Sequence, residues 1–322
     1  MKDKLFAALL AAALLLTTAC GGGSAPTGQE DDTLHILATT YPVYLFTTAV
    51  TEGVEGVEVT RLITEEVSCL HDYTLSVSDM KAIEKADVNV MNGVGLEDFM
   101  ADALAASRAA VIDCSEGIEL LPAAGHHDHD HGHEHDGEHY DPHIWLDPQR
   151  AIQMAARIRD GLMEIDQIHT DAYLSNGTLV TALLTSWHSN LQDILTSDAN
   201  IAPSNRDLIT FHDGFQYFAD AFDLTILKAI EEEEGAEASA AEIKEIVALI
   251  EEHDIPVIFT EVNGSDSTAQ AIARETGVRV AQLTTLMSGD GDELSCYLDA
   301  QLSNAAAIVN GLAGKEVLIL EN

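Results

Sequence analysis

The order of apolar and polar positions divides most of the chain into two halves of the same kind. In each half, short apolar runs alternate with segments that carry apolar residues at helical spacing. Strands are predicted at 34–39, 57–63, 86–91, 109–113, 208–211, 224–229, 256–260 and 278–283. Helices are predicted at 42–50, from Ser76 or Ser78 onward, and at 97–105, 240–252, 267–276 and 294–312. This alternation predicts two parallel sheets with helices on both faces.

The segment between the two halves has a helical pattern over nearly fifty residues, from Pro148 to about Ser197. Its apolar positions fit two helices, of which the second is the longer, although Gly177 weakens the start of that second helix. The predicted fold class is therefore α/β, with two doubly wound (βα)4-like lobes joined by a long rigid α-helix. A ligand cleft is expected between the lobes, outside the carboxyl ends of the strands.

The N-terminal residues have the pattern of a targeting signal. Two lysines precede an apolar run at 5–16, which is too short to span a bilayer. Small residues then lead into Cys20, as in bacterial lipoproteins, so we predict a signal peptide at 1–19 and lipidation of Cys20. An ordinary cleaved signal with an incidental cysteine is the alternative. Residues 20–33 are predicted to be a flexible tether.

Beyond the tether, the pattern predicts three parts. Residues 34–147 form an N-terminal α/β lobe with a histidine-rich loop at 123–141. Residues 148–199 form the helical segment, including the helix between the lobes, and residues 200–322 form a C-terminal α/β lobe. No nucleic-acid ligand is expected, because 15 Lys and Arg against 55 Asp and Glu give a net charge of −40. Cations and basic protein surfaces are favoured instead.

Three histidines recur just after a predicted strand or at the exit of a loop: His71, His143 and His212. The sheet topology is expected to bring such positions to one crevice. Three neutral imidazoles there make a site that suits Zn²⁺. For any single histidine, the alternative is a polar loop residue with a local hydrogen bond. Asp72 and Asp213 are candidates for orienting the neighbouring imidazoles, or are solvated loop carboxylates.

The motifs around these histidines resemble those of the metal-binding lipoproteins of bacterial ABC importers for zinc and manganese, the cluster A-I solute-binding proteins. The segments that carry the resemblance are 39–42, 71–73, 92–93, 96–97, 141–148, 211–218, 258–261 and 275–277. The resemblance implies that His71, His143 and His212 are metal ligands. It also implies a zinc site, because zinc members tend to have histidine where this chain has His212, whereas manganese members have a carboxylate.

The chain departs from the family pattern at two places. Leu70 stands where the family usually has proline, and Thr284 stands where many members carry a fourth, acidic ligand. A water molecule or Glu66 is the candidate to complete the coordination. The fourth ligand therefore stays open.

A tract of seven histidines lies among acidic residues and contains no apolar positions: His126, His127, His129, His131, His133, His135 and His139. Such a composition cannot pack into a core, and the tract is expected to be a surface loop. It resembles the charged loop of zinc-type family members, which implies weak accessory zinc capture. A solvated acidic loop or a tag-like insertion is the alternative.

The resulting functional hypothesis is a lipid-anchored protein outside the cytoplasm that captures Zn²⁺ and delivers it to an ABC transporter permease with its ATPase. A monomer is expected. Alternatives are a zinc-buffering lipoprotein or adhesin without a transporter, a manganese-specific importer component, and a zinc hydrolase. The hydrolase is disfavoured because no catalytic motif supplies a general base. If Cys20 is acylated, then Cys69, Cys114 and Cys296 remain, and no disulfide is predicted between Cys69 and Cys114.

Overall fold

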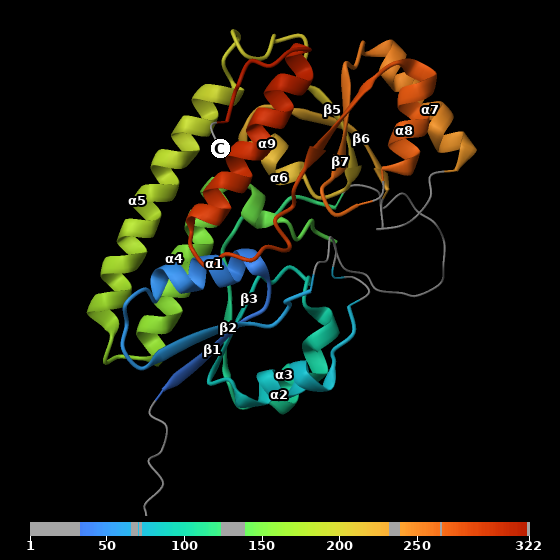
Figure 1. Ribbon diagram of the computed structural model, residues 1–322. Helices are drawn as coiled ribbons and strands as arrows, with labels where there is room; N and C mark the ends of the chain where they lie inside the picture. Colours follow the sequence, from blue (N-terminus) through green and yellow to red (C-terminus); the bar gives the residue numbers. More distant parts are fainter. Residues whose placement is uncertain are drawn as a thin grey trace, which may run out of the picture. The chain divides into compact units, whose positions relative to one another are not determined.

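The structure is a computed structural model that describes residues 33–65, 70, 73–123, 139–231, 239–264 and 266–320. Residues 34–322 form one compact unit, which contains two parallel four-stranded sheets. Figure 1 shows the first sheet with the early part of the chain and the second sheet with the late part. None of the described helices combines the length and the apolar composition needed to cross a membrane.

The first sheet has the strand order β2-β1-β3-β4, with all neighbours parallel. Its strands are β1 (Leu34–Ala38), β2 (Val57–Arg61), β3 (Val88–Met91) and β4 (Ala110–Asp113). Its helices are α1 (Tyr41–Val50), α2 (Val77–Lys85) and α3 (Ala101–Ala106), which follows the 3₁₀ turn η1 (Asp98–Met100). Figure 1 shows α1 on one side of this sheet and α2 with α3 on the other. In the central strand β1, Ile36, Leu37 and Ala38 are apolar on consecutive positions because both faces of the strand are covered.

The second sheet repeats this order as β6-β5-β7-β8. Its strands are β5 (Asp207–His212), β6 (Thr225–Glu231), β7 (Val257–Glu261) and β8 (Arg279–Leu283). Its helices are α6 (Gln216–Ala221), α7 (Ala240–Glu252), α8 (Ser267–Thr276) and α9 (Ser295–Ala313). In Figure 1, α7 and α8 lie on one side of this sheet, and α6 and α9 on the other. The predicted pair of doubly wound α/β lobes is confirmed.

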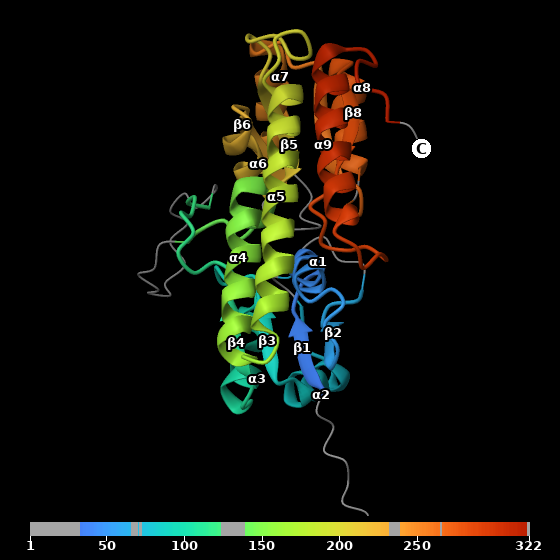
Figure 2. The same ribbon diagram turned by 90° about the vertical axis from the view of Figure 1, so that its left-hand side faces the viewer.

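The helical segment consists of two helices, α4 (Pro148–Ile165) and α5 (Thr170–Leu195), which lie side by side in Figure 2. Helix α4 begins at Pro148, and the Asp147 side chain caps it by accepting a hydrogen bond from the Gln149 N–H at 2.7 Å. Gly177 lies inside α5, where a Cβ atom would come within 2.6 Å of Arg159 on α4. The glycine that weakens the helix pattern in the sequence therefore allows the two helices to pack closely.

Helix α6 and the cysteines are two further features to compare with the expectations from the sequence. Helix α6 was not predicted, because its six residues are too few for a helical period to emerge. Cys114 and Cys296 are free thiols, and Cys114 follows the edge strand β4. Cys69 lies outside the described residues, so the prediction about its pairing stays a prediction.

Candidate metal-binding site

His143 and His212 meet in the structure although they are far apart in the sequence. His212 ends β5, and His143 precedes the 3₁₀ turn η2 (Ile144–Leu146). Their Nε2 atoms are 3.1 Å apart, and their ring planes are inclined by 87°. Two imidazole nitrogens bound to one tetrahedral zinc ion at ~2.0–2.1 Å lie roughly 3.3–3.4 Å apart. The separation therefore fits two ligands of one metal ion as well as a hydrogen bond between the rings.

Asp141 orients the His143 ring from the side opposite His212. Its Oδ1 atom lies 2.6 Å from the ring atom His143 Nδ1 and also accepts a hydrogen bond from the backbone N–H of His143 at 2.9 Å. Both residues are buried, with 1% of Asp141 and 3% of His143 exposed. The contact with Nδ1 leaves Nε2 to face His212, which is the arrangement that metal-binding histidines use.

The charges around His143 control its protonation. Burial lowers the pKa of His143, but the charge and hydrogen bond of Asp141, together with Glu261 and Asp213, outweigh burial and raise the pKa above its ordinary value. Without a bound cation, protonation of His143 is therefore favoured by its surroundings. A cation bound at Nε2 would take the place of that proton.

Gly214 leaves room beside the two imidazoles. A Cβ atom at this position would lie 2.9 Å from His212 Nε2 and 3.1 Å from His143 Nε2. A methyl group would therefore occupy the space in front of both nitrogens. The absence of a side chain at Gly214 keeps that space accessible.

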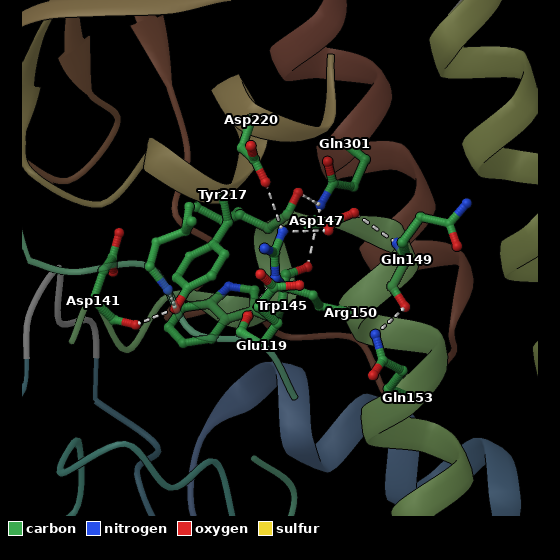
Figure 3. Close-up of polar contacts among 12 residues, drawn as sticks. Glu119, Asp141, Trp145, Asp147, Gln149, Arg150, Gln153, Tyr217, Asp220 and Gln301 are labelled. Carbon is green, nitrogen blue, oxygen red and sulfur yellow. Dashed lines mark hydrogen bonds and ion pairs between the residues drawn. The ribbon is translucent and has the colours of Figure 1, made fainter. Parts of the chain in front are cut away.

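The segment that carries His143 is held from several elements. The Asn92 side chain donates to the Pro142 carbonyl at 2.9 Å, and the Trp145 indole N–H donates to the Thr285 carbonyl at 2.8 Å. From α9, the Tyr297 hydroxyl donates to the Trp145 carbonyl at 2.8 Å. Figure 3 shows Gln301, also from α9, beside the same segment. Contacts from both lobes thus fix the backbone on either side of His143.

The remaining predicted site residues lie mostly outside the described part of the chain. This holds for His71, Glu66, Cys20, Asp72 and the first six histidines of the tract. His139, the last of the tract, is exposed, and its carbonyl accepts a hydrogen bond from the Ala123 N–H at 3.0 Å. Among the described residues, no group of three or more His, Cys, Asp or Glu side chains is placed to hold a metal ion. The structure thus brings together two of the three predicted ligands.

Two carboxylates of the site were not identified from the sequence. Asp141 orients His143, a role that the sequence suggested only for Asp72 and Asp213. Glu261 ends β7, is 7% exposed, and accepts a hydrogen bond from the Thr285 hydroxyl. The signal for Asp141 is its place two residues before His143, where its side chain reaches the His143 N–H. The Thr284 N–H donates to Asn304 Oδ1 at 2.8 Å.

A groove of about 610 Å³ lies elsewhere, between α1, α5 and the segment before α9. Its walls include Leu179, Leu183, Glu52 and Asp292 and contain no histidine. Its leucines and carboxylates lack the imidazole nitrogens of the histidine pair. The pair, rather than this groove, is therefore the candidate metal site.

Residues 36–311 match the family described as zinc-uptake complex component A, periplasmic (ZnuA). The chain belongs to the ZnuA family. It is thus a metal-binding solute-binding protein, and the resemblance seen in the sequence is confirmed. The family consists of solute-binding proteins, and the match covers both sheets.

Individual relatives of this ZnuA-family chain are named for different metals. The manganese-binding lipoprotein MntA of Halalkalibacterium halodurans is 25% identical over 246 residues, which are 76% of this chain and 77% of that protein. The zinc-binding lipoprotein AdcA of Streptococcus pneumoniae is 28% identical over 265 residues, 81% of this chain and 51% of AdcA. This chain thus spans about half the length of AdcA.

A solved structure extends the range of metals further. The solute-binding protein FpvC of Pseudomonas aeruginosa, solved with Ni²⁺, has a TM-score of 0.73 and 25% identity, and the match covers 89% of this chain and all of that chain. Family membership therefore establishes metal binding without selecting the metal.

Proposed function

We propose that this ZnuA-family protein captures Zn²⁺ outside the cytoplasm and delivers it to the permease of an ABC transporter, which its ATPase drives. Zinc is the transported substrate and is not a resident cofactor. The observation that carries the proposal is the pair of His143, which is buried, and His212, which is partly exposed, with Nε2 atoms 3.1 Å apart and Asp141 behind the His143 ring. Zn²⁺ accepts imidazole ligands readily, whereas Mn²⁺ prefers carboxylate and water oxygens.

His71 is the proposed third ligand, and a water molecule or Glu66 is the proposed fourth. Support for His71 comes from its sequence context, which resembles the family motif. Support for a fourth ligand other than the residue at position 284 comes from Thr284, which stands where many members have an acidic ligand and whose N–H is bonded to Asn304. Three protein ligands and one exchangeable position suit a carrier that must release its cargo.

The proposed location follows from the N-terminal sequence. Residues 1–19 are the proposed signal peptide, Cys20 the proposed lipid attachment site, and 20–33 the tether. The family description as periplasmic and the lipoprotein names of MntA and AdcA support a place outside the cytoplasm. The proposed parts of the remaining chain are 34–147, 148–199 and 200–322.

The histidine-rich tract is proposed to collect zinc weakly beside the site. Its seven imidazoles alternate with carboxylates, so zinc meets several donors in many geometries. The tract leads directly into the segment of Asp141 and His143. Zinc held there would be close to the proposed cleft site.

Metal selectivity tests the proposed function. Metal-free protein covering residues 21–322 is expected to bind one zinc ion tightly and to bind Mn²⁺ orders of magnitude more weakly, because its proposed protein ligands are imidazoles. Competition titrations with a chromophoric chelator, followed by elemental analysis, measure both metals on the same preparation. The relative MntA makes a manganese importer component the second candidate. Retention of manganese at an affinity equal to that of zinc would select it.

A further inference from the structure

The hydroxyl group of Tyr217 joins chain segments that lead to both histidines of the site. Tyr217 is fully buried on α6, the short helix that begins four residues after His212. Its hydroxyl donates a hydrogen bond to the Asp141 carbonyl at 2.9 Å and accepts one from the Leu121 N–H at 3.0 Å. Figure 3 shows the Tyr217 ring pointing toward Asp141. One side chain of the C-terminal lobe thus binds two backbone groups of the N-terminal lobe.

Asp141 makes a separate contact with its other end. Its carboxylate lies 2.6 Å from His143 Nδ1 and therefore sets the orientation of that imidazole. Its own N–H donates to the Leu121 carbonyl at 3.0 Å, beside the antiparallel bridge of Pro122 and Tyr140. The Tyr217 hydroxyl bonds to the Leu121 N–H and to the Asp141 carbonyl, so it links the two paired segments at residues 121 and 141.

The Tyr217 ring is itself held in place. The Arg150 guanidinium lies over it, 4.6 Å from the ring centroid. Arg150 donates to Asp147 at 2.7 Å, to Asp220 of α6 at 3.1 Å, and to the Glu119 carbonyl at 3.0 Å. Figure 3 shows this group of side chains around Arg150. Burial raises the pKa of Tyr217 to about 12, so the hydroxyl keeps its proton as a donor at neutral pH.

We propose that Tyr217 is a positioning residue of the metal site, which holds His143 and His212 at the separation that one zinc ion requires. The inference rests on the proposed function. It connects the helix that follows His212 with the backbone of the residue that orients His143. Without the hydroxyl, the Asp141 carbonyl and the Leu121 N–H lose this partner, and Asp141 is free to shift together with the imidazole it orients.

The variant Tyr217→Phe tests this role because it keeps the ring under Arg150 and removes only the hydroxyl. Loss of a group bonded directly to a metal ligand typically weakens metal binding by ~10–100-fold, and Tyr217 acts one step further away, through Asp141, so the lower part of that range applies. A weakening in that range is therefore expected, with faster zinc dissociation. Co²⁺ used as a spectroscopic probe is expected to give shifted visible bands, because the angles between the ligands change.

Tyr173→Phe is the matched control. Tyr173 is also fully buried, and its hydroxyl donates to Asp166 at 2.7 Å at the turn between α4 and α5. Both variants lose a buried hydrogen-bonding hydroxyl, so both are expected to unfold at a lower temperature in the metal-free form. Only Tyr217→Phe is expected to change the zinc affinity and the Co²⁺ spectrum. Where it fails to fold, Arg150→Lys is expected to cause a smaller change of the same kind.

The possible results separate the inference from the proposed function. If the wild-type protein binds zinc tightly and Tyr217→Phe binds it as tightly, with an unchanged Co²⁺ spectrum, the positioning role is wrong and the zinc function stands. Equal losses of affinity in Tyr217→Phe and Tyr173→Phe would also overturn the positioning role. If the wild-type protein binds no zinc, the proposed function fails first and the inference fails with it.

Discussion

Replacing His143 or His212 by alanine is expected to abolish tight zinc binding. Each change removes one of the two Nε2 atoms that face each other at 3.1 Å, so a bound ion would lose a direct ligand. The loss is expected to exceed the ~10–100-fold that removal of an orienting partner causes. Zinc competition titrations of each variant measure it. His253→Ala is the control, because His253 is bonded to Asp207 and lies outside the histidine pair.

Two further variants make this result specific. Gly214→Ala keeps every ligand but places a methyl group 2.9 Å and 3.1 Å from the two Nε2 atoms, so it is expected to block binding. Gly264→Ala, in which the nearest atom to the new Cβ would lie at 3.5 Å, is the matched control.

Replacing the tract histidines by asparagine is expected to remove only weak binding of additional zinc ions. Loss of tight binding in the tract variant, with retention in His143→Ala, would refute the histidine-pair site.

Zinc affinity is expected to fall steeply between pH 7 and pH 5.5. Imidazoles bind zinc in the neutral form, so each proton competes with the metal. An imidazole with a pKa of ~6.5 is roughly 10% neutral at pH 5.5, and three ligands together lower the apparent affinity by up to about three decades. The pKa of His143 is raised, mainly because Asp141 outweighs burial, so its proton begins to compete at a higher pH than that of an ordinary histidine.

Zinc titrations at half-unit steps from pH 7.5 to pH 5.5 measure this dependence. Asp141→Asn is expected to move the fall in affinity to lower pH, because it removes the carboxylate that favours protonated His143. It is also expected to weaken binding at pH 7.5, because the neutral amide oxygen of asparagine is a weaker acceptor for His143 Nδ1 than the carboxylate and makes the imidazole a less basic ligand. An affinity that stays constant over this range would contradict release by protonation.

Much of the fold could be predicted because both sheets are parallel and covered on both faces. Apolar runs such as 34–39 and 256–260 then stand out between amphipathic helices. Helix α6 escaped prediction, because six residues show too little periodicity. The role of Gly177 in the close packing of α5 on α4 could not be predicted either. The sequence shows that a glycine destabilises a helix, but it does not show that the Arg159 side chain packs against this one.

The meeting of His143 and His212 was predictable, because residues at the carboxyl ends of parallel strands lie at the same edge of a sheet. His212 ends β5 and His143 lies against it, as their sequence contexts indicated. The prediction for His71 stays a prediction. Asp141 could not be singled out among many acidic residues, because its role depends on the turn that directs its carboxylate to His143 Nδ1. Tyr217 could not be singled out either, because its partners lie far away in the sequence.

The most direct test of the site is anomalous X-ray diffraction from crystals of the zinc-loaded protein, recorded on both sides of the zinc absorption edge. The proposed site predicts one strong zinc peak within ~2.0–2.1 Å of both His143 Nε2 and His212 Nε2. A strong peak elsewhere, with neither nitrogen in contact with zinc, would contradict it.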